Sequence, residues 1–122
     1  MDEERLHSVI SRIADGYEKY VSCDKGWWPI IEQLDLRLAE IDPSYVIYQV
    51  KEKFGQLRFY YEPSHPKFRA SMQPIVDEMT EDAASICEVT GKPGKLMVRD
   101  APFKTFRTLC SDFDGNGWST VE

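Results

Sequence analysis

The sequence predicts an α+β fold, with a small antiparallel sheet of two hairpins packed against about three helices. Apolar residues recur at helical spacing in three segments, and β-branched or aromatic residues dominate two others. The helical segments are residues 2–21, 27–41 and 68–86, and the strand-like ones are residues 45–61 and 96–110. Helices and strands come in runs without βαβ alternation, which is typical of this class. The 122 residues suit a single domain spanning the whole chain.

The first two helices are predicted from apolar residues three and four positions apart. The apolar pattern of residues 2–21 is interrupted by Gly26, and a second stripe begins at Trp27. Pro29 is acceptable in a first turn, and Asp42 before a proline should end the second helix. The second stripe should pack against Leu57 and Phe59 of the first hairpin, through Trp27, Ile31, Leu34 and Leu38.

The segment YVIYQVKEKFGQLRFYYEP, residues 45–63, predicts the first hairpin because its residues alternate with a period of two. Its polar middle, residues 51–55, should form the turn. Pro74 lies inside the third helical stripe, where we expect it to kink the helix or to mark its true start. LMVRD and TFRTLC should form the second hairpin, and residues 111–122 a flexible tail.

The charges are segregated along the chain. The formal net charge of −6 disfavours a general nucleic-acid binder, yet residues 45–69 hold 5 basic and 2 acidic groups. Residues 70–90 hold 5 acidic groups and no basic group. Acid therefore falls on predicted helices and base on predicted strands. Solvated helix faces and strand edges explain such a division without a partner, and a binding surface explains it with one.

Several sequence features predict a cytoplasmic protein that does not enter a membrane. No apolar run approaches the roughly 18 residues of a membrane span, and the N-terminus opens with acids, unlike a secretory signal. The three cysteines, an odd number, favour a reducing compartment over a disulfide framework.

The stretch CEVTGKPG, beginning at Cys87, has the outline of half a zinc knuckle. Cys87-x-x-Thr90 is followed some twenty residues later by Cys110-x-x-Phe113, the spacing of two half-sites. Threonine is a poor zinc ligand and phenylalanine is none, so we expect no stoichiometric zinc and no cofactor. A closed site would need two further ligands, for which Cys23, His65, Asp112 and Asp114 are the candidates. Otherwise the two cysteines are small buried apolar residues.

The chain also resembles a known group in four motifs: GWWPII from residue 26, QVKEKFGQLRFYY from residue 49, CEVTG from residue 87 and TLC from residue 108. These motifs are similar to a family of small uncharacterised phage and bacterial proteins, with a C-x-x-C and T-L-C-x-x-H pair. The resemblance spans about residues 23–113. It implies a phage or prophage source and zinc ligands at the positions of Cys87, Thr90, Cys110 and Phe113, two of which are substituted here. It implies no activity.

The sequence offers little for two further chemistries, calcium binding and catalysis. Asp112, Asp114 and Asn116 with Gly117 match the start of an EF-hand loop, but the bidentate position falls beyond Glu122, so a calcium site is incomplete. For catalysis, only His7 and His65 offer imidazoles, and no nucleophile elbow, phosphate loop or H-E-x-x-H motif is present. The sequence therefore predicts that the protein is not an enzyme.

The first hairpin carries more aromatic rings than one core face needs, set among cations. Such a surface favours a protein partner, because Tyr, Trp and Arg dominate interface hot spots. It is also compatible with base stacking by a nucleic-acid accessory protein. We predict a non-catalytic protein-interaction module that binds and modulates a host or competitor protein, with nucleic-acid binding and residual zinc or calcium binding as alternatives. The predicted contact residues are Tyr45, Lys51, Lys53, Phe54, Arg58 and Tyr60.

Overall fold

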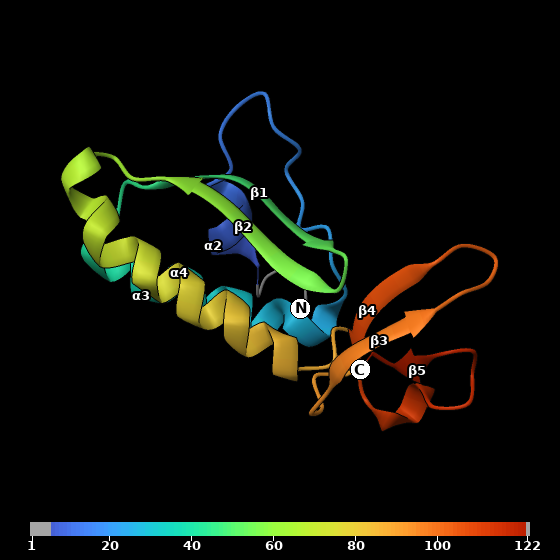
Figure 1. Cartoon of the computed structure of the whole chain (residues 1–122). Helices are drawn as coiled ribbons and strands as arrows, with labels where there is room; N and C mark the ends of the chain where they lie inside the picture. Colours follow the sequence, from blue (N-terminus) through green and yellow to red (C-terminus); the bar gives the residue numbers. More distant parts are fainter. Residues whose placement is uncertain (1–5, 122) are drawn as a thin grey trace.

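Two antiparallel sheets and two main helices build the fold, as the computed structural model of the chain shows for residues 6–121 (Figure 1). The α+β class predicted from the sequence is confirmed. The elements in chain order are α2 (His7–Ser11), α3 (Trp28–Ile41), β1 (Val46–Lys53), β2 (Gln56–Glu62), α4 (Arg69–Asp82), β3 (Lys95–Arg99), β4 (Thr105–Leu109) and β5 (Ser119–Thr120).

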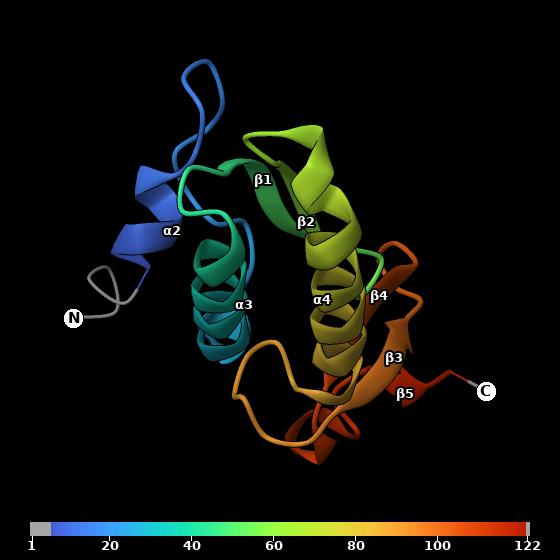
Figure 2. The same ribbon diagram turned by 90° about the vertical axis from the view of Figure 1, so that its left-hand side faces the viewer.

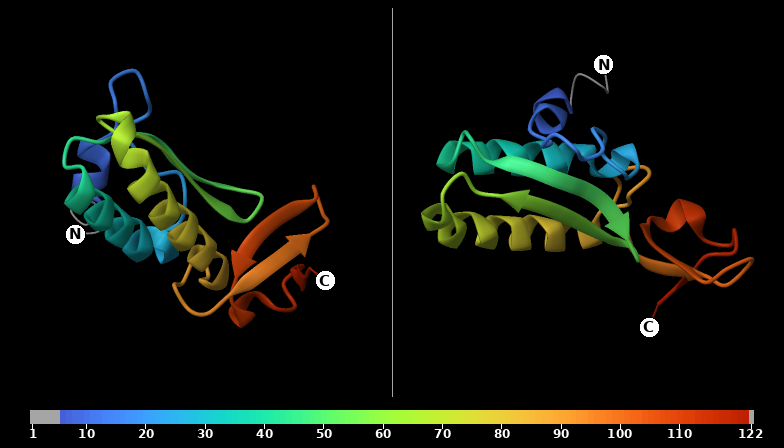
Figure 3. Two further views of the ribbon diagram at one scale, coloured as in Figure 1. Left: turned by 60° about the vertical axis from the view of Figure 1, so that its left-hand side comes forward. Right: turned by 90° about the horizontal axis from the view of Figure 1, so that it is seen from above.

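The two predicted hairpins lie in separate sheets. Strands β1 and β2 form a two-stranded sheet, and the second sheet has the order β4-β3-β5. Helices α3 and α4 lie side by side beneath the first hairpin (Figure 2). The second sheet lies beyond the turn of that hairpin (Figure 3). Of the helices in residues 6–121, none is both long and apolar enough to span a membrane.

The first predicted helix is much shorter than expected. Within the described residues it covers only α2, and residues 12–22 then contact the outer edge of β1 near their two ends, with a loop between these contacts (Figure 1). There the Ile47 amide donates to the Arg12 carbonyl at 2.9 Å, and the Ser22 amide donates to the Val50 carbonyl at 2.9 Å. Gly16, with φ of +90°, turns the chain between these contacts. The edge of β1 thus binds part of the backbone that the apolar stripe predicted to be helical. Residues 2–5 of the predicted helix lie outside the described residues.

The second and third helices follow the apolar stripes. Helix α3 ends at Ile41, immediately before Asp42-Pro43, as predicted. Helix α4 begins at Arg69, so Pro74 lies inside it and does not mark its start. Proline removes one backbone hydrogen bond there. The fully buried Met72 side chain anchors the preceding turn in the core.

The first hairpin turns tightly at Phe54 and Gly55, whose φ angles are +54° and +81°. Lys53 pairs with Gln56 across this turn. Two central residues with positive φ are what a two-residue type I′ connection requires, because its twist matches that of the strands. A bulge at Tyr48 shifts the register between Ile47 and Gln49.

The buried residues form two clusters. The main cluster joins the apolar stripes of the helices to the inner face of the hairpin, including Ile31, Leu34, Leu57 and Phe59. The smaller cluster underlies the second sheet and comprises Cys87, Met97, Leu109, Cys110 and Trp118. Residues 111–121, within the predicted flexible tail, contain a 3-10 turn at Ser111–Phe113 and strand β5, which pairs with β3.

Candidate protein-interaction surface

The outer face of the β1–β2 hairpin gathers most of the predicted contact residues. Lys51 pairs directly with Arg58 across the strands, and Gln49 pairs with Tyr60. Lys51 and Arg58 are partly exposed, and Tyr60 is 43 % exposed. Lys53 and Phe54 follow at the turn, where the Lys53 ammonium lies 5.8 Å from the Phe54 ring centroid. We call Lys51, Lys53, Phe54, Arg58 and Tyr60 the outer hairpin face.

Two cations opposite one another are an unfavourable arrangement for the folded chain. Like charges in direct cross-strand register repel, whereas opposite charges there would stabilise the sheet. The Arg58 Nε atom is also buried from solvent without a hydrogen-bond partner among residues 6–121. The Lys51–Arg58 pair thus concentrates positive charge on a partly exposed surface, where cross-strand repulsion opposes folding.

Phe54 is a further residue of this face whose properties do not favour folding. Its ring is 65 % exposed, and its backbone occupies the left-handed region. Residues other than Gly, Asn and Asp lose roughly 1 kcal/mol or more when they adopt that conformation. Strained backbone geometry of this kind is concentrated at functional sites.

Tyr45 lies elsewhere, in the core. It is 2 % exposed, and its hydroxyl donates to Asp35 at 2.5 Å. Arg12 and Ser8 contact the same carboxylate, each at 2.7 Å. Burial and the hydrogen bond to Asp35 raise the pKa of Tyr45. This buried polar network holds α2 and the start of β1 against α3, so Tyr45 does not contribute to an exposed contact surface.

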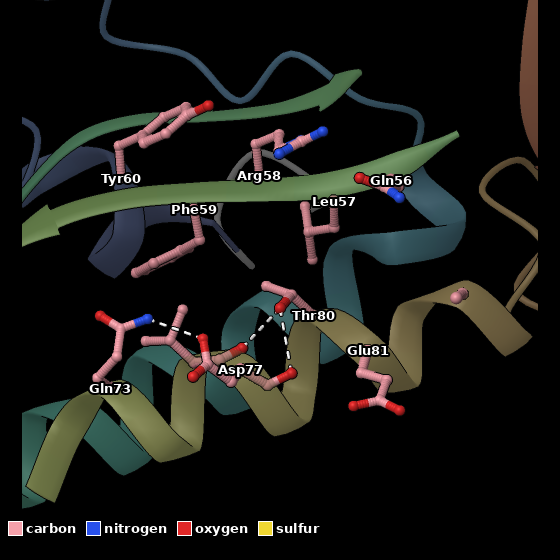
Figure 4. Close-up of a pocket in the computed structure, with 11 residues that line it drawn as sticks. Gln56, Leu57, Arg58, Phe59, Tyr60, Gln73, Asp77, Thr80 and Glu81 are labelled. Carbon is pink, nitrogen blue, oxygen red and sulfur yellow. Dashed lines mark hydrogen bonds between the residues drawn. The ribbon is translucent and has the colours of Figure 1, made fainter. Parts of the chain in front are cut away.

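A groove follows the free side of β2, between this strand and α4 (Figure 4). It has a volume of about 450 Å³. Leu57 and Phe59 point toward α4, whereas Arg58 and Tyr60 point to the opposite side of the sheet. The helix contributes the polar wall, which consists of Gln73, Asp77, Thr80 and Glu81.

The cations of the second sheet are mostly engaged within the protein. Arg107 contacts Asp24 at 2.5 Å and Glu88 at 3.0 Å, and these carboxylates raise its pKa against the effect of burial. The Arg99 guanidinium lies 4.7 Å from the ring of Trp118. Lys51 and Arg58 belong to the other sheet. The basic residues of the two hairpins therefore do not share one continuous sheet.

The knuckle-like segments do face one another. The Thr90 amide donates to Cys87 Sγ at 3.4 Å, and the Thr90 hydroxyl donates to Cys110 Sγ at 3.4 Å. Burial acts to raise the pKa of Cys87, but hydrogen bonds from Thr90 and neighbouring amides outweigh it and lower this pKa. Phe113 packs against the same cluster. The fold thus brings all four positions of the predicted ligand set together, with two of them occupied by non-ligands.

The other proposed ligands do not complete a metal site. Cys23 packs against the main core, and burial with nearby carboxylates raises its pKa to about 12. Asp112 forms an ion pair with Lys92 at 2.8 Å. Asp114 is held in a bridge to Trp118, and His65 caps a 3-10 turn by accepting from the Lys67 amide. Nowhere in residues 6–121 do three His, Cys, Asp or Glu side chains group so that they could hold a metal ion.

Sequence reasoning missed the α4 wall of the groove. The acidic run in residues 70–90 was visible, but nothing in its spacing distinguishes a groove wall from a solvated helix face. Comparison with family models, curated proteins and solved structures finds no match to this chain.

Proposed function

We propose that this chain is a non-catalytic protein-interaction module and that the outer hairpin face contacts its partner. The observation that carries the proposal is Phe54, an aromatic ring 65 % exposed on a backbone with φ of +54°. A turn selected only for folding would have Asn or Gly at this position. A large exposed ring gives the fold little, but it supplies the apolar anchor that interfaces use.

The charges around Phe54 indicate the complementary surface. Lys51 and Arg58 place two cations side by side, and Tyr60 adds a half-exposed ring next to them. A partner with carboxylates around an apolar patch would relieve the repulsion between the cations and bury the rings. Complementary charge of this kind mainly accelerates association, whereas the buried rings slow dissociation. The resemblance of the central motif to phage and bacterial proteins supports a host or competitor protein as the partner.

Nucleic-acid binding is less well supported, because Arg107 is paired with carboxylates and the acidic α4 adjoins the hairpin. We expect short oligonucleotides to bind no more tightly than the non-specific range of roughly 10⁻⁴ to 10⁻⁶ M at physiological salt. Fluorescence anisotropy across a salt series measures this. Sub-micromolar, salt-sensitive binding that Arg58→Glu abolishes would favour the nucleic-acid alternative.

The proposal is tested by capturing proteins from a lysate of the bacterial host on the immobilised chain. We compare the wild type with a Phe54→Asn, Arg58→Glu double variant. Phe103→Ser is the matched control, since Phe103 is 78 % exposed but lies in the loop between β3 and β4. A protein retained by the wild type and the control, and lost with the double variant, supports the outer hairpin face. Identical retention by all three chains contradicts it.

A further inference from the structure

The outer edge of β2 has backbone groups that no other strand pairs. The Val50 carbonyl accepts from Ser22, and the Glu52 amide donates to Ser22, so both groups point away from β2. In an antiparallel pair, when the backbone amide and carbonyl of one residue point away from the partner strand, those of the residue opposite it also point away. Phe59 and Leu57 are these opposite residues. Their amides and carbonyls therefore point to the free edge of β2, where residues 6–121 provide no partner strand.

One edge of the hairpin is covered by another segment of the chain, and within residues 6–121 the other edge is not. Residues 12–22 bond to the edge of β1 at two places, which protects it. The edge of β2 runs for seven residues beside the 450 Å³ groove and has no such cover in the described part of the chain. An open strand edge is a template for an added strand, and proteins usually shield it when it has no such use.

The groove lies where an additional strand would pair with β2. A new strand would lie about 4.8 Å from β2 and extend the sheet over α4. Its side chains would alternate between α4 and the outer side, where Arg58 and Tyr60 lie. The α4 residues that border this space are Gln73, Val76, Asp77, Thr80 and Glu81.

The charge of this wall selects among possible occupants. Asp77 and Glu81 line the groove, and residues 70–90 contain no basic group. A strand with lysine or arginine on its helix-facing positions would be attracted. A second copy of this chain pairing through its own β2 would bring another acidic α4 toward the first. Because like charges repel, a basic segment fits better than a second copy.

We propose that an extended segment of a partner protein, with lysine or arginine at alternate positions, adds to the free edge of β2 as the third strand of its sheet. The backbone hydrogen bonds of Leu57 and Phe59 supply affinity, and Asp77 and Glu81 supply selectivity. Such strand addition is a recurring mode of peptide recognition. The inference rests on the proposed interaction function and specifies how the groove takes part in it.

The test uses isotopically labelled full-length protein and two synthetic peptides, each matched in length to the seven residues of β2. One alternates Lys with Val and the other alternates Glu with Val. We expect only the Lys-Val peptide to bind at concentrations up to about 1 mM, within the weak range for a short unoptimised ligand. Near saturation it should slow hydrogen exchange at the Leu57 and Phe59 amides on the order of tenfold. The Arg58 and Tyr60 amides, which face β1, should already exchange slowly without peptide.

Charge-reversal variants separate strand addition from general attraction. Asp77→Lys with Glu81→Lys should lower the affinity for the Lys-Val peptide about tenfold or more. Asp82→Lys, outside the groove on the same helix, should change this affinity less than about twofold. Asp77→Asn with Glu81→Gln gives a milder second pair, and circular dichroism checks that each variant folds. Three results overturn the inference: no binding, equal binding of the Glu-Val peptide, or binding without protection of Leu57 and Phe59.

A second copy as occupant would be recognised by sedimentation equilibrium. A dimer in which the Leu57 and Phe59 amides are already protected without peptide would overturn the basic-segment proposal. Failure of the strand-addition inference can also be distinguished from failure of the proposed function. If a captured protein is lost with the Phe54→Asn, Arg58→Glu variant but retained by the Asp77→Lys, Glu81→Lys variant, the outer hairpin face binds and strand addition does not occur.

Discussion

Thr108 donates its hydroxyl hydrogen to the backbone carbonyl of Gly55 at 2.7 Å, which fixes the turn of the first hairpin to strand β4 of the second sheet. Gly55 also approaches Leu96 so closely that a Cβ atom there would lie 2.4 Å from Leu96 Cδ1. The φ of +81° is the ground that favours glycine at position 55, because the Leu96 side chain could shift away from a Cβ atom. The two sheets therefore meet at a contact that depends on the turn geometry of the first.

Thr108→Val should destabilise the protein although it nearly preserves volume. Thr108 is 1 % exposed, so the Gly55 carbonyl would lose a buried partner, at about 1–3 kcal/mol. Urea unfolding measures the loss. Thr105→Val is the control, because that hydroxyl bonds only within an exposed loop. A loss from Thr108→Val no larger than that of the control would show that the contact does not hold the sheets together.

Phe54→Asn should stabilise the protein while weakening partner binding. The change relieves the left-handed strain of Phe54 and creates the Asn-Gly turn that hairpins prefer. We expect a gain of about 0.5–1 kcal/mol in the free energy of unfolding. Thermal unfolding measures it. A loss of stability would mean that the exposed ring contributes to the fold, which would remove the main support for the proposed interaction surface.

Leu34→Ala should cost about 2–5 kcal/mol, the range for truncating a fully buried leucine. Leu34 is 0 % exposed and belongs to the same cluster as Leu57 and Phe59. Chemical denaturation gives the value, and Leu36→Ala, at a site 49 % exposed on the same helix, should cost much less. A loss below about half a kcal/mol would contradict the assignment of this helix face to the core.

Asp42→Asn should reduce stability at neutral pH and have less effect in acid. Burial acts to raise the pKa of Asp42, but hydrogen bonds from Ser64 and Ser44 outweigh it and lower this pKa. The Ser64 amide and hydroxyl each donate at 2.7 Å. A lowered pKa stabilises the folded state above the ordinary aspartate pKa of about 3.9, and this contribution is lost as pH falls through the folded-state value.

Urea unfolding of Asp42→Asn and wild type from neutral pH down to about pH 3 therefore should show a difference that narrows with acidity. At neutral pH the difference should be about 1–3 kcal/mol. Ser71→Ala, at an exposed position, should leave the pH dependence unchanged. A constant difference at every pH would indicate that the variant acts by packing and not through the carboxylate.

Local sequence patterns predicted the elements that depend on neighbouring residues only. The alternation of residues 45–61 reflects side-chain direction, and the end of the helix before Asp42-Pro43 reflects backbone geometry, so both can be predicted from the sequence. The first helix was wrong because its apolar residues, Ile13 among them, also suit a segment bonded beside β1. Which arrangement prevails depends on the open edge of β1, a strand that comes later in the chain.

The candidate site was predicted in part for the same reason. Alternation places Arg58 and Tyr60 on one side of β2, so the outer face is legible in the sequence. The placement of Tyr45 in the core depends on Asp35 and Arg12, which only the tertiary fold brings together. The groove beside β2 depends on the position of α4, and no local pattern records it.

The pair Thr90→Cys with Phe113→His should turn the knuckle-like segments into a zinc site. Thr90 already contacts the sulfur atoms of both Cys87 and Cys110, so a cysteine there would place three thiols together. Phe113 packs on the same cluster and supplies the fourth position. The lowered pKa of Cys87 favours the thiolate that binds metal. Elemental analysis should find about one zinc per chain in the double variant.

The wild type, with two ligands of four, should have no zinc, and adding Cys110→Ser to the double variant should greatly weaken zinc binding. A double variant that folds but retains no zinc would show that the two segments face one another at the wrong distance for a tetrahedral site, so that the ribbon-like spacing in the sequence is coincidental.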